Sequence, residues 1–156
     1  MRFSTKLFLI IFFNFLALKT YTIDIPKDLI VKVIKESENE ASTISKKLDL
    51  ISVKYTGWIF DSNATTNNYC DAKGKMFDSN IVDKFRHTEP FRFILGEGIV
   101  IKGWDLGLQN MRINEKRCLI IPPHLAYGNR RIGNIIKPNS TLIFEVKLLK
   151  ILKVEK

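Results

Sequence analysis

The fold is decided by G-E-G-I-V-I-K-G-W-D-L-G-L-Q-N-M at residues 96–111 and by E-K-R-C-L-I-I-P-P-H-L-A-Y-G at residues 115–128. In the first segment, apolar residues recur at spacings of three and four: Ile101, Trp104, Leu108 and Met111. This period predicts a short helix of about two turns with one apolar face. We therefore expect the Trp104 side chain to point towards the core.

The second segment predicts a strand that follows the helix. Leu119 and Ile121 fall on one face after three charged residues, and Pro122-Pro123 ends the strand. Cys118 alternates with Leu119, so we expect it to point away from the core, within reach of the loop that carries Cys70. A disulfide between the two cysteines and a pair of free thiols both remain open.

Four more segments predict strands, because apolar residues alternate or dominate within them: residues 29–35, 50–60, 91–95 and 141–153. Together with the strand after the helix, they make five short strands and one helix. An antiparallel sheet folded around the helix, an α+β architecture, accommodates them. The length of 156 residues, with 46% hydrophobic and 26% charged residues, is typical of one globular domain.

Residues 1–20 predict a signal peptide. Arg2 and Lys6 precede an apolar run of about twelve residues, too short for the roughly twenty that span a bilayer. We therefore expect the secretory pathway, with the protein in the endoplasmic reticulum lumen or secreted. An uncleaved membrane anchor is the alternative, because Leu16-Ala17-Leu18 is a poor cleavage site. Unless the segment stays uncleaved, we expect no stable membrane insertion.

Two N-glycan acceptor patterns begin at Asn63 and Asn139. A signal peptide makes both relevant, because glycans are added in the secretory pathway. Asn63 is the better candidate acceptor, since it lies in a long polar loop.

The composition excludes several classes of function. The formal net charge is +9, but the basic residues are dispersed among acids rather than clustered with aromatics, so we expect no nucleic-acid binding. His87 and His124 have no cysteine or carboxylate at metal-ligand spacing, and we interpret them as ordinary surface histidines. The glycines at 96 and 98 lack the third glycine of a dinucleotide loop. The sequence therefore predicts neither a metal nor a cofactor.

Six blocks of sequence resemble, in the same order, the FKBP-type peptidyl-prolyl isomerases, the immunophilins that bind tacrolimus. The blocks are V-K-Y-T-G at 53–57, G-K-M-F-D-S at 74–79, P-F-R-F-I-L-G at 90–96, V-I-K-G-W at 100–104, A-Y-G at 126–128 and T-L-I-F-E-V at 141–146. The chain looks most like the small single-domain members of the endoplasmic reticulum. The resemblance implies an FKBP-like half-barrel, a five-stranded antiparallel sheet wrapped around one short helix.

Measured against the family pattern, the chain divides into three parts: the signal segment at 1–20, a strand and polar connection at 21–47, and the isomerase domain at 48–153. Two stretches of that domain, near residues 61–74 and 81–89, resemble insertions. The loop tip I-G-N at residues 132–134 replaces the His-Pro-Gly of many family members. These departures put substrate preference and drug affinity in doubt.

The resemblance also implies a shallow apolar pocket for a prolyl ring. It gives catalytic roles to Asp78, Trp104, Tyr127 and Phe144. It gives substrate-binding roles to Tyr55, Phe77, Phe91, Val100, Ile101 and Ile136, with Ile136 at the rim. Taken without the family, most of the aromatic residues would be interpreted as core, and Asp78 as a turn-capping carboxylate.

The function that follows is cis-trans isomerisation of X-Pro bonds in folding or mature proteins. Expected partners are proline-containing polypeptides and macrolides of the tacrolimus type, and we expect a monomer. The alternative is a binding module whose groove holds a proline-containing partner segment with little or no turnover.

Overall fold

The computed structural model describes residues 23–39, 41–85 and 87–152, so the predicted signal peptide lies outside the described residues. Its strands are β1 Ile30–Lys35, β2 Leu50–Phe60, β3 Lys73–Ser79, β4 Phe91–Ile94, β5 Lys116–Ile121 and β6 Leu142–Leu152. Its helices are α1 Lys102–Gly107 and the 3-10 turns η1 Tyr69–Asp71, η2 Asp83–Phe85 and η3 Pro123–Leu125. No described helix has the length and apolar character that a membrane crossing requires.

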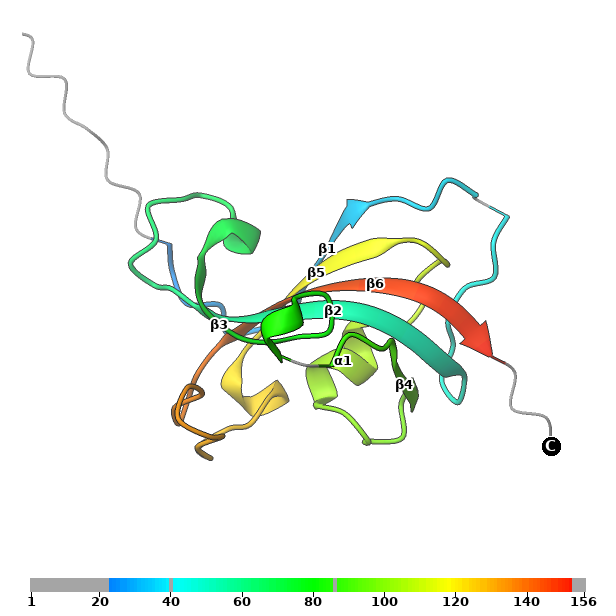
Figure 1. The fold of residues 1–156 in the computed structure, drawn as a ribbon. Coiled ribbons are helices and arrows are strands. Elements are labelled where there is room, and N and C mark those ends of the chain that lie inside the picture. Colours follow the sequence, from blue (N-terminus) through cyan, green and yellow to red (C-terminus); the bar gives the residue numbers. More distant parts are fainter. Residues whose placement is uncertain (1–22, 40, 86, 153–156) are drawn as a thin grey trace, which may run out of the picture.

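The strands form one open antiparallel sheet in the order β1-β5-β6-β2-β3, with β4 also paired to β2 (Figure 1). The predicted α+β class is confirmed, but the predicted number of five strands is wrong, because β3 is a sixth. Its sequence K-G-K-M-F-D-S places Met76 and Phe77 next to each other rather than in alternation. β3 is a strand because its backbone pairs with β2, which no local pattern reveals. The predicted polar loop therefore ends before Lys73.

Strand β2 is central because both of its edges are paired. One edge pairs with β6 along Leu50–Ile59. The other edge is shared, since β4 pairs with β2 up to Val53 and β3 pairs with it from Thr56 onwards. The segment 80–90, which connects β3 to β4, therefore leaves and rejoins the edge of β2 on either side of Lys54 and Tyr55.

Helix α1 packs against β5 through two glycines one turn apart. A Cβ atom on Gly103 would lie 2.4 Å from a side-chain carbon of Ile121, and one on Gly107 would lie 2.8 Å from a carbon of Leu119. Only glycine allows this close approach. The same packing buries Trp104, which is 4% exposed as predicted. The helix is shorter than the apolar period suggested: the buried Leu108 is its C-cap, and the buried Met111 lies beyond the turn that follows.

The two faces of the sheet carry separate apolar clusters. Leu119 and Ile121 belong to the main core beneath α1, whereas Cys118 and Ile120 belong to a smaller cluster on the other face. Figure 1 shows α1 on one side of the sheet and the segment containing η1 on the opposite side.

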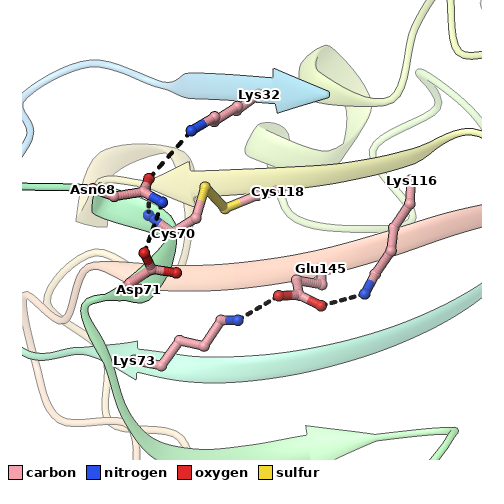
Figure 2. Close-up of a disulfide and its surroundings, with 8 residues drawn as sticks. All are labelled: Lys32, Asn68, Cys70, Asp71, Lys73, Lys116, Cys118 and Glu145. Atoms are coloured by element: carbon pink, nitrogen blue, oxygen red, sulfur yellow. Dashed lines mark hydrogen bonds and ion pairs between the residues drawn. A yellow bond between two sulfur atoms is a disulfide. The ribbon is translucent and has the colours of Figure 1, made fainter. Parts of the chain in front are cut away.

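Cys118 lies on the face opposite Leu119 and away from the main core, as predicted, and it is fully buried there in the second cluster. It forms a disulfide with Cys70 of η1, with a Cα–Cα distance of 6.1 Å (Figure 2). The disulfide attaches the 61–72 segment to the face of the sheet opposite α1, and that segment covers Cys118.

Candidate active site

The indole of Trp104 forms the floor of a pocket on the α1 side of the sheet. Its ring centroid lies 5.1 Å from that of Tyr55 and 5.2 Å from that of Phe144, both in edge-to-face contact. The Phe91 ring also meets it edge-on, at 6.3 Å. Such near-perpendicular ring contacts are a favoured arrangement of aromatic side chains, and three of them hold the floor in its orientation.

The pocket has a volume of about 540 Å³. It is lined by Tyr55, Phe77, Asp78, Phe91, Gly98, Ile99, Val100, Ile101, Lys102, Trp104, Ala126, Tyr127, Arg130 and Phe144. Nine of the ten residues that the sequence placed at the site are therefore brought together here.

The tenth residue, Ile136, is not among those that line this pocket. It is 4% exposed, packs in the main core and lines a smaller neighbouring cavity with Phe77 and Tyr127. The backbone of Ile136 pairs with that of Ile132. The expected rim position is therefore wrong for Ile136, whereas the partner residue Ile132 is exposed.

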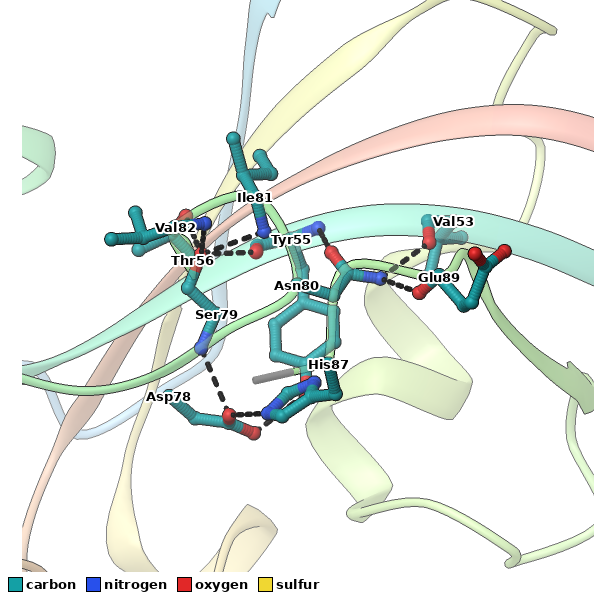
Figure 3. A network of polar contacts seen from close by, with 10 residues as sticks. All are labelled: Val53, Tyr55, Thr56, Asp78, Ser79, Asn80, Ile81, Val82, His87 and Glu89. Carbon is teal, nitrogen blue, oxygen red and sulfur yellow. Dashed lines mark hydrogen bonds and ion pairs between the residues drawn. The ribbon is translucent and has the colours of Figure 1, made fainter. Parts of the chain in front are cut away.

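The charged part of the site is a network centred on the Asp78 carboxylate (Figure 3). The Tyr55 hydroxyl donates to Asp78 Oδ2 at 2.6 Å, and the Ser79 backbone N–H donates to Oδ1 at 2.9 Å. His87 Nε2 lies 2.8 Å from the same Oδ1. Asp78 is thus held by three groups at the wall of the pocket, which is more than a turn cap requires.

His87 is the residue that sequence reasoning missed. It was interpreted as an ordinary surface histidine, but it contacts a carboxylate at the pocket wall. It lies in the apparent insertion at residues 81–89, where no hydrophobic period indicates a direction. The path of the loop between β3 and β4 brings His87 to Asp78.

Both phenols of the pocket remain protonated at neutral pH. Burial raises the pKa of Tyr55, and the hydrogen bond to Asp78 raises it further. Burial also raises the pKa of Tyr127, with the Asp78 charge adding to the effect and Arg130 opposing it. A protonated phenol is a hydrogen-bond donor, so Tyr127 can donate to a carbonyl bound in the pocket.

A second carboxylate shapes the loop that precedes α1. Asp105 accepts hydrogen bonds from the backbone N–H groups of Gly96 and Gly98, at 2.8 and 2.9 Å. Both glycines have positive φ angles, 82° and 70°, which favour glycine. The loop ends at Ile101, the residue before the helix, where a backbone N–H has no acceptor within the helix. Ile101 is one of the residues that line the pocket.

The arrangement binds and orients rather than attacks. Among the described residues, no three or more His, Cys, Asp or Glu side chains are grouped so that they could hold a metal ion. The pocket offers an apolar aromatic surface, hydrogen-bond donors and one partnered carboxylate. The fold and the site therefore define an α+β protein with an open aromatic pocket on the α1 side of its sheet.

Comparison with known proteins agrees with this class. The family model of FKBP-type peptidyl-prolyl cis-trans isomerases matches residues 41–149. The chain is 42% identical over 121 residues to FK506-binding protein 1A of Neurospora crassa, covering 78% of this chain and 88% of that protein. It is 42% identical over 117 residues to FK506-binding protein 2 of Yarrowia lipolytica, covering 75% and 70%.

A third relative is longer than this chain. The chain is 44% identical over 113 residues to FK506-binding protein 2B of Rhizopus delemar, covering 72% of this chain but only 47% of that protein. The chain thus spans about half the length of this relative and most of the other two. With the family model matched over more than half of its length, the chain belongs to the FKBP-type peptidyl-prolyl cis-trans isomerase family.

Proposed function

We propose that this protein accelerates the cis-trans isomerisation of X-Pro bonds in polypeptides, with the prolyl ring seated on Trp104. The observation that carries the proposal is the aromatic pocket itself. Its floor is fixed by edge-to-face contacts with Tyr55 and Phe144, and its rim carries the Tyr127 phenol. Family membership supports the same reaction.

Such a pocket is sufficient for this reaction. The barrier of roughly 20 kcal/mol comes from amide resonance, which twisting removes, so no nucleophile or proton transfer is needed. The twisted amide has a smaller carbonyl dipole than either planar form, and a dry apolar site therefore favours the transition state. If binding lowered the barrier by about 7 kcal/mol, the rate would rise by roughly five decades.

The polar groups would orient the substrate. The Ile101 backbone N–H would donate to the carbonyl that follows the proline, and the Tyr127 phenol would donate a second hydrogen bond. Asp78, held by Tyr55 and Ser79, would lie near the carbonyl of the twisting amide. A carboxylate fixed in advance does not reorganise during the reaction, which favours the transition state.

The test is isomerisation of short X-Pro peptides, measured by NMR exchange without a coupling protease. Trp104→Leu, Tyr127→Phe and Asp78→Val should each lower kcat/KM. Trp58→Leu is the matched control, because the chain has two tryptophans and Trp58 packs on the opposite face of the sheet. A folded wild-type protein without activity, but with tight binding to one proline-containing segment, would favour a binding module instead.

We also propose that the pocket binds macrolides of the tacrolimus type. The relatives named for FK506 binding support this. In a Trp58→Phe variant, Trp104 is the remaining tryptophan, so tacrolimus should change its fluorescence and inhibit isomerisation at the same concentration. Inhibition without a change in Trp104 emission would place the drug elsewhere.

We further propose a location in the secretory pathway, in the endoplasmic reticulum or outside the cell. The apolar segment before residue 20 and the Cys70–Cys118 disulfide support an oxidising compartment. Asn63 is exposed, as a glycan acceptor must be. Cell fractionation with N-terminal sequencing should find a luminal or secreted chain that begins near residue 21. A cytosolic chain that retains Met1 and reduced cysteines would refute the location.

A further inference from the structure

The segment 80–90 is clamped to β2 at both ends. The Asn80 side chain accepts from the Tyr55 backbone N–H at 2.7 Å and donates to the carbonyls of Val53 at 3.1 Å and Glu89 at 3.0 Å (Figure 3). The side-chain amide of Asn80 thus hydrogen-bonds to the backbone of β2 in the gap between β3 and β4. It also joins the two ends of the segment, Asn80 and Glu89.

A lysine reinforces the clamp. The Lys54 ammonium donates to the Asn80 carbonyl at 2.8 Å and also to the Thr88 carbonyl. His87 is the neighbour of Thr88, so the clamp sets where its imidazole lies. The outcome is the 2.8 Å contact between His87 Nε2 and Asp78 Oδ1.

Among the described residues, the groups around His87 come from its own segment and from the strands beside it. Asp78 is the group in direct contact, and the Tyr55 phenol occupies the other carboxylate oxygen. On the segment itself, the Phe85 ring lies 6.4 Å from the imidazole, and the Lys84 ammonium lies over that ring at 4.9 Å. Lys54 is engaged by the clamp, and Glu89 contributes its carbonyl to it.

Two other residues of the pocket lining, Tyr127 and Arg130, interact electrostatically with Asp78 or with each other. Tyr127 lies near enough to Asp78 for the carboxylate to raise the pKa of its phenol, and Arg130 acts on that phenol in the other direction. Among the described residues, His87 is the basic side chain in direct contact with the Asp78 carboxylate.

We propose that His87 is a positioning residue for the isomerase site, which in its protonated form holds the Asp78 carboxylate in place and so makes the activity depend on pH. The inference rests on the proposed isomerase function. Histidine is the side chain that ordinarily changes charge in the physiological pH range. An imidazolium forms a charge-assisted hydrogen bond to the carboxylate, which fixes the carboxylate more firmly than a neutral ring does.

The direction of the effect follows from the contact between His87 and Asp78. When His87 is protonated, its charge-assisted hydrogen bond holds the Asp78 carboxylate in one orientation at the pocket wall. When His87 is neutral, this hydrogen bond is weaker and the carboxylate is held less firmly. We therefore expect kcat/KM to fall as pH rises through the range in which histidine loses its proton. The side chains are 49% and 36% exposed, so solvent screens the pair and the fall should be about twofold to fivefold.

The experiment compares pH profiles of kcat/KM on one X-Pro peptide between about pH 5.5 and 8.5, the range in which a histidine side chain ordinarily changes its charge. His87→Gln should give a flat profile near the high-pH value of the wild type. His87→Arg, with a permanent charge, should give a flat profile near the low-pH value. The chain has two histidines, so His124→Gln, an exposed residue of η3, is the matched control and should keep the wild-type step.

A second readout does not depend on activity. The carboxylate carbon of Asp78, followed by NMR, should shift with pH over the same range in the wild type and in His124→Gln, but not in His87→Gln. Thermal unfolding of each variant confirms that the variants being compared are folded.

The outcomes separate the inference from the function on which it rests. A wild-type enzyme that is active at every pH without a step, or a step that survives in His87→Gln, overturns the role of His87 and leaves the isomerase function intact. A folded protein that is inactive at every pH overturns both, and in that case the carboxylate shift shows whether the His87–Asp78 contact exists.

Discussion

Gly57 of β2 lies opposite Phe144 of β6, and aromatic rings fill the space where a side chain at Gly57 would stand. A Cβ atom at this position would lie 2.7 Å from Phe77 Cζ and 2.8 Å from Phe144 Cε1. The two rings also contact each other edge-on at 5.4 Å. The glycine therefore allows both walls of the pocket to close onto the strand.

Gly57→Ala should disturb both stability and the pocket. One added methyl group forces the rings of Phe77 and Phe144 outwards, and overpacking of this kind costs about 1–3 kcal/mol. We expect a lower free energy of unfolding in denaturant titrations and weaker binding of X-Pro peptides. If both quantities stay at the wild-type values, the rings have room to move and the proposed constraint is wrong.

Tyr55 and Asp78 should be energetically coupled. Tyr55→Phe removes the donor to Asp78 Oδ2, and Asp78→Asn removes the charge that accepts it. Because the Asp78 side chain is partly exposed, we expect a coupling of about 0.5–1.5 kcal/mol in the free energy of unfolding. A double-mutant cycle measures this value, and additive single effects would contradict the pairing.

The disulfide should contribute stability without contributing to the reaction. Cys70 and Cys118 are 48 residues apart in the chain, and a closed loop of that size is worth roughly 2–4 kcal/mol. We expect Cys70→Ser/Cys118→Ser to lose about that much, as seen in denaturant unfolding. The kcat/KM of the folded variant should match the wild type, since the bond lies on the face opposite the pocket. A large loss of activity in the folded variant would show that the two faces are coupled.

Glu145 should make stability depend on pH. Burial alone would raise the pKa of Glu145, but hydrogen bonds and charges from Lys116 of β5 and Lys73 of β3 outweigh it and lower the pKa below the ordinary 4.5 (Figure 2). A folded-state pKa below the unfolded value means that the stabilisation is present above the unfolded pKa. It is lost as pH falls through the folded pKa.

Glu145→Gln tests this dependence. We expect the variant to be less stable than the wild type at neutral pH, because both lysines lose their charged partner. The difference should shrink as pH falls below about 4, where glutamate becomes protonated in the unfolded chain and then in the folded chain. Urea unfolding at several pH values measures it. A difference that is constant from neutral to acidic pH would exclude the carboxylate charge as its cause.

Much of the fold was predictable because its signals are local. The apolar residues of β2 predicted residues 50–60, the bounds that the structure gives, and Trp104 was expected in the core, where it lies. Strand β3 was missed because adjacent Met76 and Phe77 do not alternate, so its strand character depends on pairing with β2.

The site shows the same division. Tyr55, Trp104, Phe144 and six other residues were expected together and line one pocket. Ile136 was misplaced because its burial depends on packing against the main core, which the sequence of its loop does not indicate. His87 was missed because its direction depends on a clamp formed by Lys54 and Asn80.

The sequence by itself determined the class of fold, the family and most of the pocket, since these depend on apolar periods and on blocks of residues in a fixed order. Only the tertiary structure decided the pairing of β3, the burial of Cys118 in a second cluster and the contact of His87 with Asp78. The physical reason is that these features are made by contacts between segments distant in the chain. The residues next to a position in the sequence do not indicate which distant segments will pack against it.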